Sequence, residues 1–142
     1  MKKLAEDFLT KELCFQLYVA SKEIIRLYKP FLAELDLTYT SFIALLAIED
    51  DMSVKCLGEK LFLDSGTLSP LLKKMENQGL LNRSRSPEDE RILKIDLTQK
   101  GREIKSQLPN ISKKVYQNIK SRNPEIDYHQ LMHFLNQLNL AF

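Results

Sequence analysis

Apolar residues recur every three or four positions along most of the chain and alternate with polar residues in one stretch past its middle. The first helical run covers residues 10–29 and comprises Leu13, Leu17, Ala20, Ile24 and Leu27. This spacing predicts a long helix with one apolar face, and Thr10 is positioned to cap its start. Pro30 has no backbone donor, so we expect it to kink or end this helix.

Residues 63–98 carry the clearest pattern in the chain. Asp64 can cap a helix, and Gly79 supplies the left-handed residue that often ends one. The apolar face of that helix comprises Leu68, Leu71, Leu72 and Met75. Residues 80–85 and 91–97 then alternate well enough to be two strands joined by a polar turn. The stretch therefore predicts a helix followed at once by a β-hairpin.

Capping residues mark three more helix starts, at Thr38, Ser53 and Thr98. The first of these helices ends near Asp50, and the third contains Pro109, where we expect a kink. A break at Asn123–Pro124 precedes a last helix from about residue 125. The predicted fold class is therefore mostly α, with a small β-hairpin between three or four helices and two more.

A polar-faced helix followed by a hairpin is the outline of a winged helix-turn-helix, in which the hairpin is the wing. We expect this module over about residues 36–98 of a single domain that spans residues 1–142. The apolar stripes of about 8–35 and 99–142 exceed what so small a module can bury, so we expect them to form a homodimer interface. Two-fold symmetry would set two recognition helices about one turn of double-stranded DNA apart, on a pseudo-palindromic operator.

The polar face of the helix after Asp64 is the first candidate for contact with DNA. Short hydroxyls, a glycine that permits close approach and two cations form it: Ser65, Gly66, Thr67, Ser69, Lys73 and Lys74. Hydroxyls contact bases or phosphates, and lysine reads guanine or holds phosphate. Arg83 and Arg85 in the hairpin are explained equally well as phosphate contacts or as a solvated strand edge.

Composition adds limits to this interpretation. The 142 residues carry a net charge of only +2, so a DNA-binding surface has to be local. Two cysteines are too few for a disulfide framework, and neither an apolar leader nor a membrane-spanning run stands out, so we expect a cytoplasmic protein with free thiols. His129 and His133 stand four apart without a third ligand, so we expect neither a metal nor a cofactor.

The stretch from Leu63 to Thr98 resembles the MarR family of bacterial winged-helix regulators. Asp89-Glu90-Arg91 followed by Leu97-Thr98 is a specific part of this likeness, which covers nearly the whole chain. The resemblance implies that Arg91, near the tip of the wing, contacts the minor groove and that Asp89 orients it.

The N-terminal half is similar to the branch of this family that senses organic hydroperoxides through one cysteine. The shared positions are Leu13-Cys14-Phe15 together with Tyr18, Tyr28 and Tyr39. The resemblance implies a homodimeric repressor that leaves DNA when Cys14 is oxidised, with the tyrosines supporting the sensor. Related one-cysteine members act as wider regulators of stress or virulence.

The position of Cys14 in its helix supports the sensor role independently. Near a helix start, and with Lys11 one turn earlier, a thiolate is favoured by the helix dipole and by positive charge. Tyr18 lies one turn on, whereas Tyr28 lies about 21 Å further along a straight helix. Tyr28 and Tyr39 would therefore reach Cys14 from an antiparallel partner subunit. The alternative is that Cys14 is a small buried apolar residue.

Oxidation of the thiolate would give a sulfenic acid, which needs a second reactant. The C-terminal half has no cysteine to supply one, and we interpret Cys56, in the first helix of the helix-turn-helix, as a core residue. A mixed disulfide between Cys14 and a small thiol is therefore the expected reversible state.

Three other functions stay open: a regulator whose dimer seam binds a small phenolic ligand, a thiol peroxidase that turns over at Cys14, and a pure protein-interaction module. We do not expect an enzyme, because no resolving cysteine is well placed and the helix-hairpin module would be unexplained.

Overall fold

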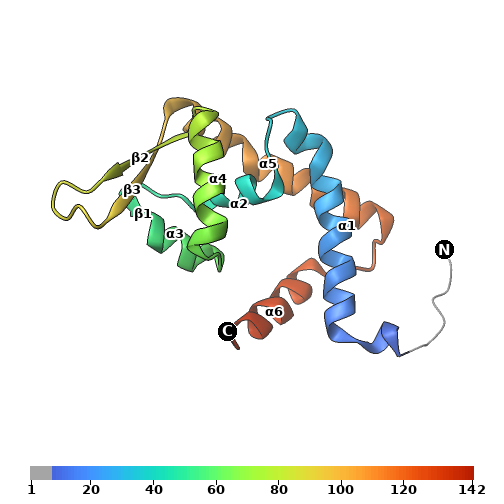
Figure 1. Cartoon of the computed structure of the whole chain (residues 1–142). Coiled ribbons are helices and arrows are strands. Elements are labelled where there is room, and N and C mark those ends of the chain that lie inside the picture. The colour runs from blue at the N-terminus through green and yellow to red at the C-terminus, as the bar shows by residue number, and fades with distance from the viewer. Residues whose placement is uncertain (1–7) are drawn as a thin grey trace.

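The computed structural model describes residues 8–142, and the expectation about a leader at residues 1–7 lies outside them. Figure 1 shows the elements in space. In chain order they are a short 3-10 helix η1 (Leu9–Lys11), α1 (Leu13–Ala33), α2 (Tyr39–Ala47), β1 (Met52–Ser53), α3 (Val54–Leu61), α4 (Ser65–Asn77), β2 (Leu81–Arg85), β3 (Leu93–Leu97), α5 (Gln99–Arg122) and α6 (Tyr128–Asn139). Within residues 8–142, no helix combines the length and the apolar character that crossing a membrane requires.

The predicted winged helix-turn-helix is confirmed. Helices α3 and α4 form the helix-turn-helix, and β2 and β3 form a hairpin that projects as the wing (Figure 1). We refer to residues 52–97, from β1 to β3, as the head. Helix α1 lies at the end of the molecule away from the wing, α5 runs toward that end, and α6 turns back from it along the lower side of the view (Figure 1).

Side-chain caps start four of the helices where the sequence predicts them. Thr38, Ser53, Asp64 and Thr98 each accept a hydrogen bond from a backbone amide in the first turn of the following helix. Gly79 has a φ of 74° just past α4, in the left-handed region that glycine adopts without strain.

Three helix boundaries differ from the predictions. Helix α1 is capped by Glu12 rather than Thr10, and it continues through Pro30 to Ala33. Pro109 likewise lies inside α5. The last helix begins at Tyr128, three residues later than expected, because Asp127 provides its cap. A proline removes one hydrogen bond, and packing along the rest of a long helix can offset that loss.

A third strand, β1, was not predicted. It is two residues long and pairs Met52 with Ile95 and Ser53 with Lys94, which gives the antiparallel order β1-β3-β2. The central strand of the sheet is therefore β3, so the wing is hydrogen-bonded directly to the segment that leads into α3.

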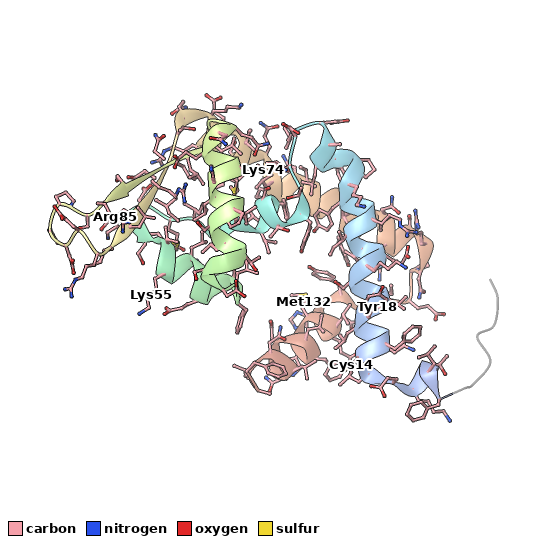
Figure 2. The ribbon with its side chains drawn as sticks, in the orientation of Figure 1. Cys14, Tyr18, Lys55, Lys74, Arg85 and Met132 are labelled. Carbon is pink, nitrogen blue, oxygen red and sulfur yellow. The ribbon has the colours of Figure 1, made fainter. Side chains whose placement is uncertain are left out.

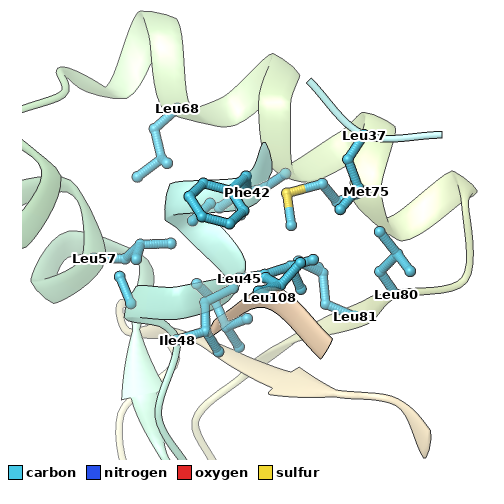
Figure 3. Close-up of a cluster of buried hydrophobic side chains, with 14 of the residues drawn as sticks. Leu37, Phe42, Leu45, Ile48, Leu57, Leu68, Met75, Leu80, Leu81 and Leu108 are labelled. Atoms are coloured by element: carbon cyan, nitrogen blue, oxygen red, sulfur yellow. The ribbon is translucent and has the colours of Figure 1, made fainter. Parts of the chain in front are cut away.

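The hydrophobic core lies where the head meets α2 and α5 (Figure 3). Its completely enclosed members include Leu45, Leu57, Leu72, Met75, Leu81, Ile95 and Leu108. Gly101 lets α5 approach the head closely, because a Cβ atom there would lie 2.0 Å from the carbonyl oxygen of Leu80. The first turn of α5 is thereby fixed against the strand that starts the wing.

Helix α6 has an apolar face that the described chain covers only in part. None of its residues is buried, and the exposed fraction is 60% for Phe134 and 44% for Leu131. Leu13 and Tyr18 at the start of α1 are likewise 56% and 62% exposed. Both chain ends therefore carry large apolar side chains that the protomer alone does not bury.

Candidate nucleic-acid interface and thiol site

Helix α4 turns one face to the core and the other outward. Leu68, Leu72 and Met75 are buried on the inner side. The outward residues are all exposed, namely Ser65, Gly66, Thr67, Ser69, Lys73 and Lys74. The structure thus brings the six predicted contacts together on one accessible helix face.

Asp64 fixes the start of α4. Its Oδ1 accepts a hydrogen bond of 2.7 Å from the backbone amide of Thr67. That bond, followed by one from the Thr67 side chain and a weaker one from the Gly66 amide, holds the pKa of Asp64 below its usual range. The carboxylate is therefore charged at neutral pH and is committed to the helix rather than free to bind a cation.

The wing holds its arginines in three different ways. Arg85 is exposed, whereas Arg83 is held by Glu76 of α4, with 3.1 Å between Nε and Oε2. Arg91 donates to both oxygens of Asp89 at 3.1 Å, while its side chain stays 89% exposed. This contact lowers the pKa of Asp89, whose carboxylate orients the guanidinium.

Sequence reasoning missed two residues beside this surface. Lys55 at the start of α3 is exposed, and Phe62 in the turn between α3 and α4 is 78% exposed (Lys55 is labelled in Figure 2). Both line a cavity of about 760 Å³ that also contains Ser65 and Arg91. Lys55 stands two residues after the Ser53 cap, in the first turn of α3, so the sequence could have indicated it. No sequence signal indicated that Phe62 would point outward.

Cys14 lies in the first turn of α1 and is exposed (Figure 2). Its backbone amide donates to Oε1 of Glu12 over 3.4 Å, so the residue occupies the helix start where a thiolate is favoured. Tyr18 lies one turn further along the same helix and is also exposed. In the protomer, Cys14 is thus an accessible thiol rather than a core residue.

Tyr28 and Tyr39 lie far along α1 and at the start of α2. Their rings meet edge to face with 5.2 Å between centroids, and both rings also contact Phe42. The Tyr28 hydroxyl donates to Oγ of Ser112 in α5 over 3.4 Å. Burial, followed by the proximity of Tyr28, raises the pKa of Tyr39, so its phenol remains a proton donor. The structure gathers the two tyrosines but does not bring them to Cys14 of the same chain.

The interpretation of Cys56 as a core residue is wrong. Cys56 is exposed on α3, whereas its neighbours Leu57 and Gly58 face the core. A two-turn helix presents only a narrow apolar stripe, and Leu57 with Gly58 occupies it. His129 and His133 are exposed, and residues 8–142 contain no group of three potential ligands that could hold a metal.

Comparisons with known proteins identify sequence relatives. A family model described as "Transcriptional regulator SarA/Rot" matches residues 26–108. The chain is 54% identical over 113 residues to the HTH-type transcriptional regulator SarZ of Staphylococcus saprophyticus, covering 78% of this chain and 77% of that protein. It is 49% identical over 135 residues to SarZ of Staphylococcus aureus (strain USA300), covering 92% and 91%.

Solved structures of similar fold include several regulators. Reduced AbfR bound to DNA has a TM-score of 0.72 and 27% identity, covering 94% of this chain and 91% of that one. Overoxidized AbfR bound to DNA has a TM-score of 0.68 and 29% identity, covering 94% and 95%. The reduced form of MarR from E. coli, at 22% identity and a TM-score of 0.78 over 89% and 96%, shows likeness of fold alone.

Proposed function

The chain belongs to the SarA/Rot family of transcriptional regulators, and from this premise we propose that it binds DNA as a homodimeric repressor and is released when Cys14 is oxidised. The resemblance to winged-helix regulators of the MarR type is thereby confirmed, while the one-cysteine branch is part of the proposal.

The exposed face of α4 is the observation that carries DNA binding. Its hydroxyls and lysines are free to face a major groove, since the opposite face is buried in the core. Arg85 and Arg91 add two exposed cations on the wing, although Glu88, Asp89 and Glu90 lie beside Arg91. AbfR, which shares 27% of its residues with this chain, was solved bound to DNA, and this supports the same partner here.

The partly exposed apolar faces of α1 and α6 support the homodimer. Leu13, Leu131 and Phe134 are each about half exposed, so burying the rest of each side chain would contribute about 1 kcal/mol. A second copy would bury them by two-fold symmetry. Within one chain, Tyr28 and Tyr39 lie too far from Cys14 to contact it. An antiparallel second copy would bring its own Tyr28 and Tyr39 to Cys14.

The redox step follows from the chemistry of an exposed thiol. The Cys14 thiolate attacks one oxygen of an organic hydroperoxide, the O–O bond breaks, and the products are a sulfenic acid and an alkoxide that takes a proton to become the alcohol. A small thiol then displaces water from the sulfenic acid and leaves a mixed disulfide. Cys56 lies in the head, away from Cys14, so a small thiol remains the proposed partner (Figures 1 and 2).

Fluorescence anisotropy with the gene's own upstream region tests the proposal. Wild-type protein, Cys14→Ser and Cys56→Ser are compared with and without an organic hydroperoxide. We expect all three to bind, and we expect the oxidant to release wild type and Cys56→Ser but not Cys14→Ser. Release of Cys14→Ser from DNA by the oxidant would show that a residue other than Cys14 senses it.

If peroxide does not change DNA binding by any of the three proteins, the redox role is contradicted. That result would favour a regulator that responds to a small phenolic ligand. Sustained consumption of peroxide with a thiol as reductant would favour the thiol peroxidase. A failure of the reduced wild type to bind any duplex would contradict the DNA-binding proposal itself and would favour a protein-interaction module.

A further inference from the structure

The cavity between the helix-turn-helix and the wing shares only Ser65 and Arg91 with the contacts proposed so far. Four parts of the head line it: the start of α3, the turn at Phe62, the first residues of α4 and the segment from Arg91 into β3. One backbone strand of a duplex separates each major groove from the adjacent minor groove. If α4 enters the major groove and the wing the minor groove, that strand has to cross the surface between them, where this cavity lies.

Two cations from different elements border the cavity. Lys55 of α3 is exposed and forms no ion pair within residues 8–142. Arg91 uses Nε and Nη2 for Asp89, which leaves its other amino group without an ion-pair partner in the described chain. A phosphate in this cavity would therefore meet donors from both α3 and the wing.

Two carboxylates also line the cavity, and they restrict the kind of anion that can bind. Asp64 is occupied by the start of α4, whereas Glu59 is exposed. Because the acids balance the cations in number, a free anion would gain little net attraction. A phosphate that the rest of a bound duplex delivers to the cavity does not need that net attraction.

Phe62 adds an apolar wall in an unusual conformation. Its φ of 56° lies in the left-handed region that bulky residues rarely adopt, and its ring is 78% exposed, so the protomer gains little from it. Leu68 and Ile92 also border the cavity. An apolar wall beside two cations matches a deoxyribose attached to its phosphate.

We propose that this cavity seats one segment of the DNA sugar–phosphate backbone, in which Lys55 and Arg91 bind a phosphate and Phe62 packs against the adjoining deoxyribose. The inference rests on the proposed DNA binding, adds Lys55 and Phe62 to it, and assigns Arg91 of the wing to a backbone phosphate. Because a backbone contact carries no base information, its contribution is the same for every duplex.

The salt dependence of DNA binding tests the role of Lys55. Wild type, Lys55→Gln and the matched control Lys29→Gln, an exposed lysine of α1, are titrated with the upstream duplex and with an unrelated duplex from 50 to 200 mM salt. Each lost phosphate contact lowers the slope of log K against log salt by about 0.9, so a dimer should lose about 1.8. Between 50 and 200 mM salt, the fold-loss of affinity should therefore be about ten times smaller for Lys55→Gln than for wild type, on both duplexes.

Three results of this titration would overturn the inference. They are an unchanged slope for Lys55→Gln, an equal change in Lys29→Gln, and an effect on the upstream duplex alone. Inorganic phosphate, added at constant ionic strength, should not raise the melting temperature of the wild type. A rise that disappears in Lys55→Gln would identify a site for free anions instead. Wild-type protein that binds neither duplex would overturn the proposed function together with this inference.

Phe62→Asn separates a DNA contact from a structural role. Asparagine tolerates the left-handed conformation, so the melting temperature should hold or rise. DNA affinity should nevertheless fall several-fold on both duplexes. An unchanged affinity, or a joint loss of melting temperature and affinity, would show that Phe62 does not contact the backbone.

Discussion

Glu76 of α4 accepts two hydrogen bonds from Arg83 of β2, one from the backbone amide and one from Nε, both over 3.1 Å and both onto Oε2. The Arg83 side chain is only 21% exposed. A single carboxylate oxygen thus joins α4 to the first strand of the wing, the two elements that we propose contact DNA.

Replacing Glu76 by alanine should loosen this joint. Arg83 would lose its partner at a half-buried position, so we expect the free energy of unfolding to fall by about 1–2 kcal/mol. Urea denaturation measures the change, with Glu125→Ala, an exposed acid outside the head, as the control. DNA affinity should also weaken because the wing is less well aligned. Unchanged stability would mean that Glu76 and Arg83 are joined only weakly.

Asp64→Asn should reduce the sensitivity of the protein to acid. The pKa of Asp64 is lowered in the folded state, so its stabilising effect is present above the unfolded-state value near pH 4 and is lost as pH falls through the folded-state value. Asparagine retains a capping oxygen but does not titrate.

The measurement for Asp64→Asn is the change in urea midpoint between pH 7 and pH 3, which should be smaller for the variant than for wild type. Glu125→Gln controls for the removal of one carboxylate. An equal change in wild type and Asp64→Asn would show that the cap contributes equally in both charge states.

Gly66→Ala should separate stability from DNA binding. A Cβ atom at Gly66 would lie 3.4 Å from Oδ1 of Asp64, which is an ordinary contact, and alanine favours a helix by up to about 1 kcal/mol. The melting temperature should therefore rise. The added methyl group stands on the outward face of α4, so affinity for the upstream duplex should fall. An unchanged affinity would place DNA further from the start of α4.

Lys105→Met should weaken the contact between α5 and α2. Its amine donates to the carbonyl of Ile48 at the end of α2, a position where the helix dipole also favours a cation. Methionine keeps most of the side-chain length but cannot donate, so we expect a loss of about 1–2 kcal/mol in urea denaturation. Lys113→Met on the exposed face of α5 serves as the control. A loss of equal size in the control would assign the effect to charge or helix propensity.

The helix starts could be predicted because a cap is a local interaction. Asp64 and Thr67, or Thr98 and Gly101, are three residues apart, so the sequence contains both partners of each bond. The outward face of α4 was predictable for a related reason, since the apolar period leaves its hydroxyls and lysines on one side.

The remaining features depend on partners that are distant in sequence. Strand β1 is too short to show alternation, and it exists because Met52 meets Ile95. The exposure of Cys56 depends on the rotation of a two-turn helix, which Leu57 sets by packing into the core. The outward ring of Phe62 depends on one backbone torsion, and side-chain type alone does not reveal it.

The pairing of β1 with β3 also affects how the chain folds during synthesis. Met52 and Ile95 are about forty residues apart, and α3 and α4 lie inside the loop that their pairing closes. Closing such a loop costs conformational entropy before the sheet bonds repay it. On the ribosome, the helices of the head therefore emerge well before β3 can fix them. Any variant that slows formation of the wing prolongs the time during which the apolar sides of α3 and α4 are exposed to the chaperones of the cell.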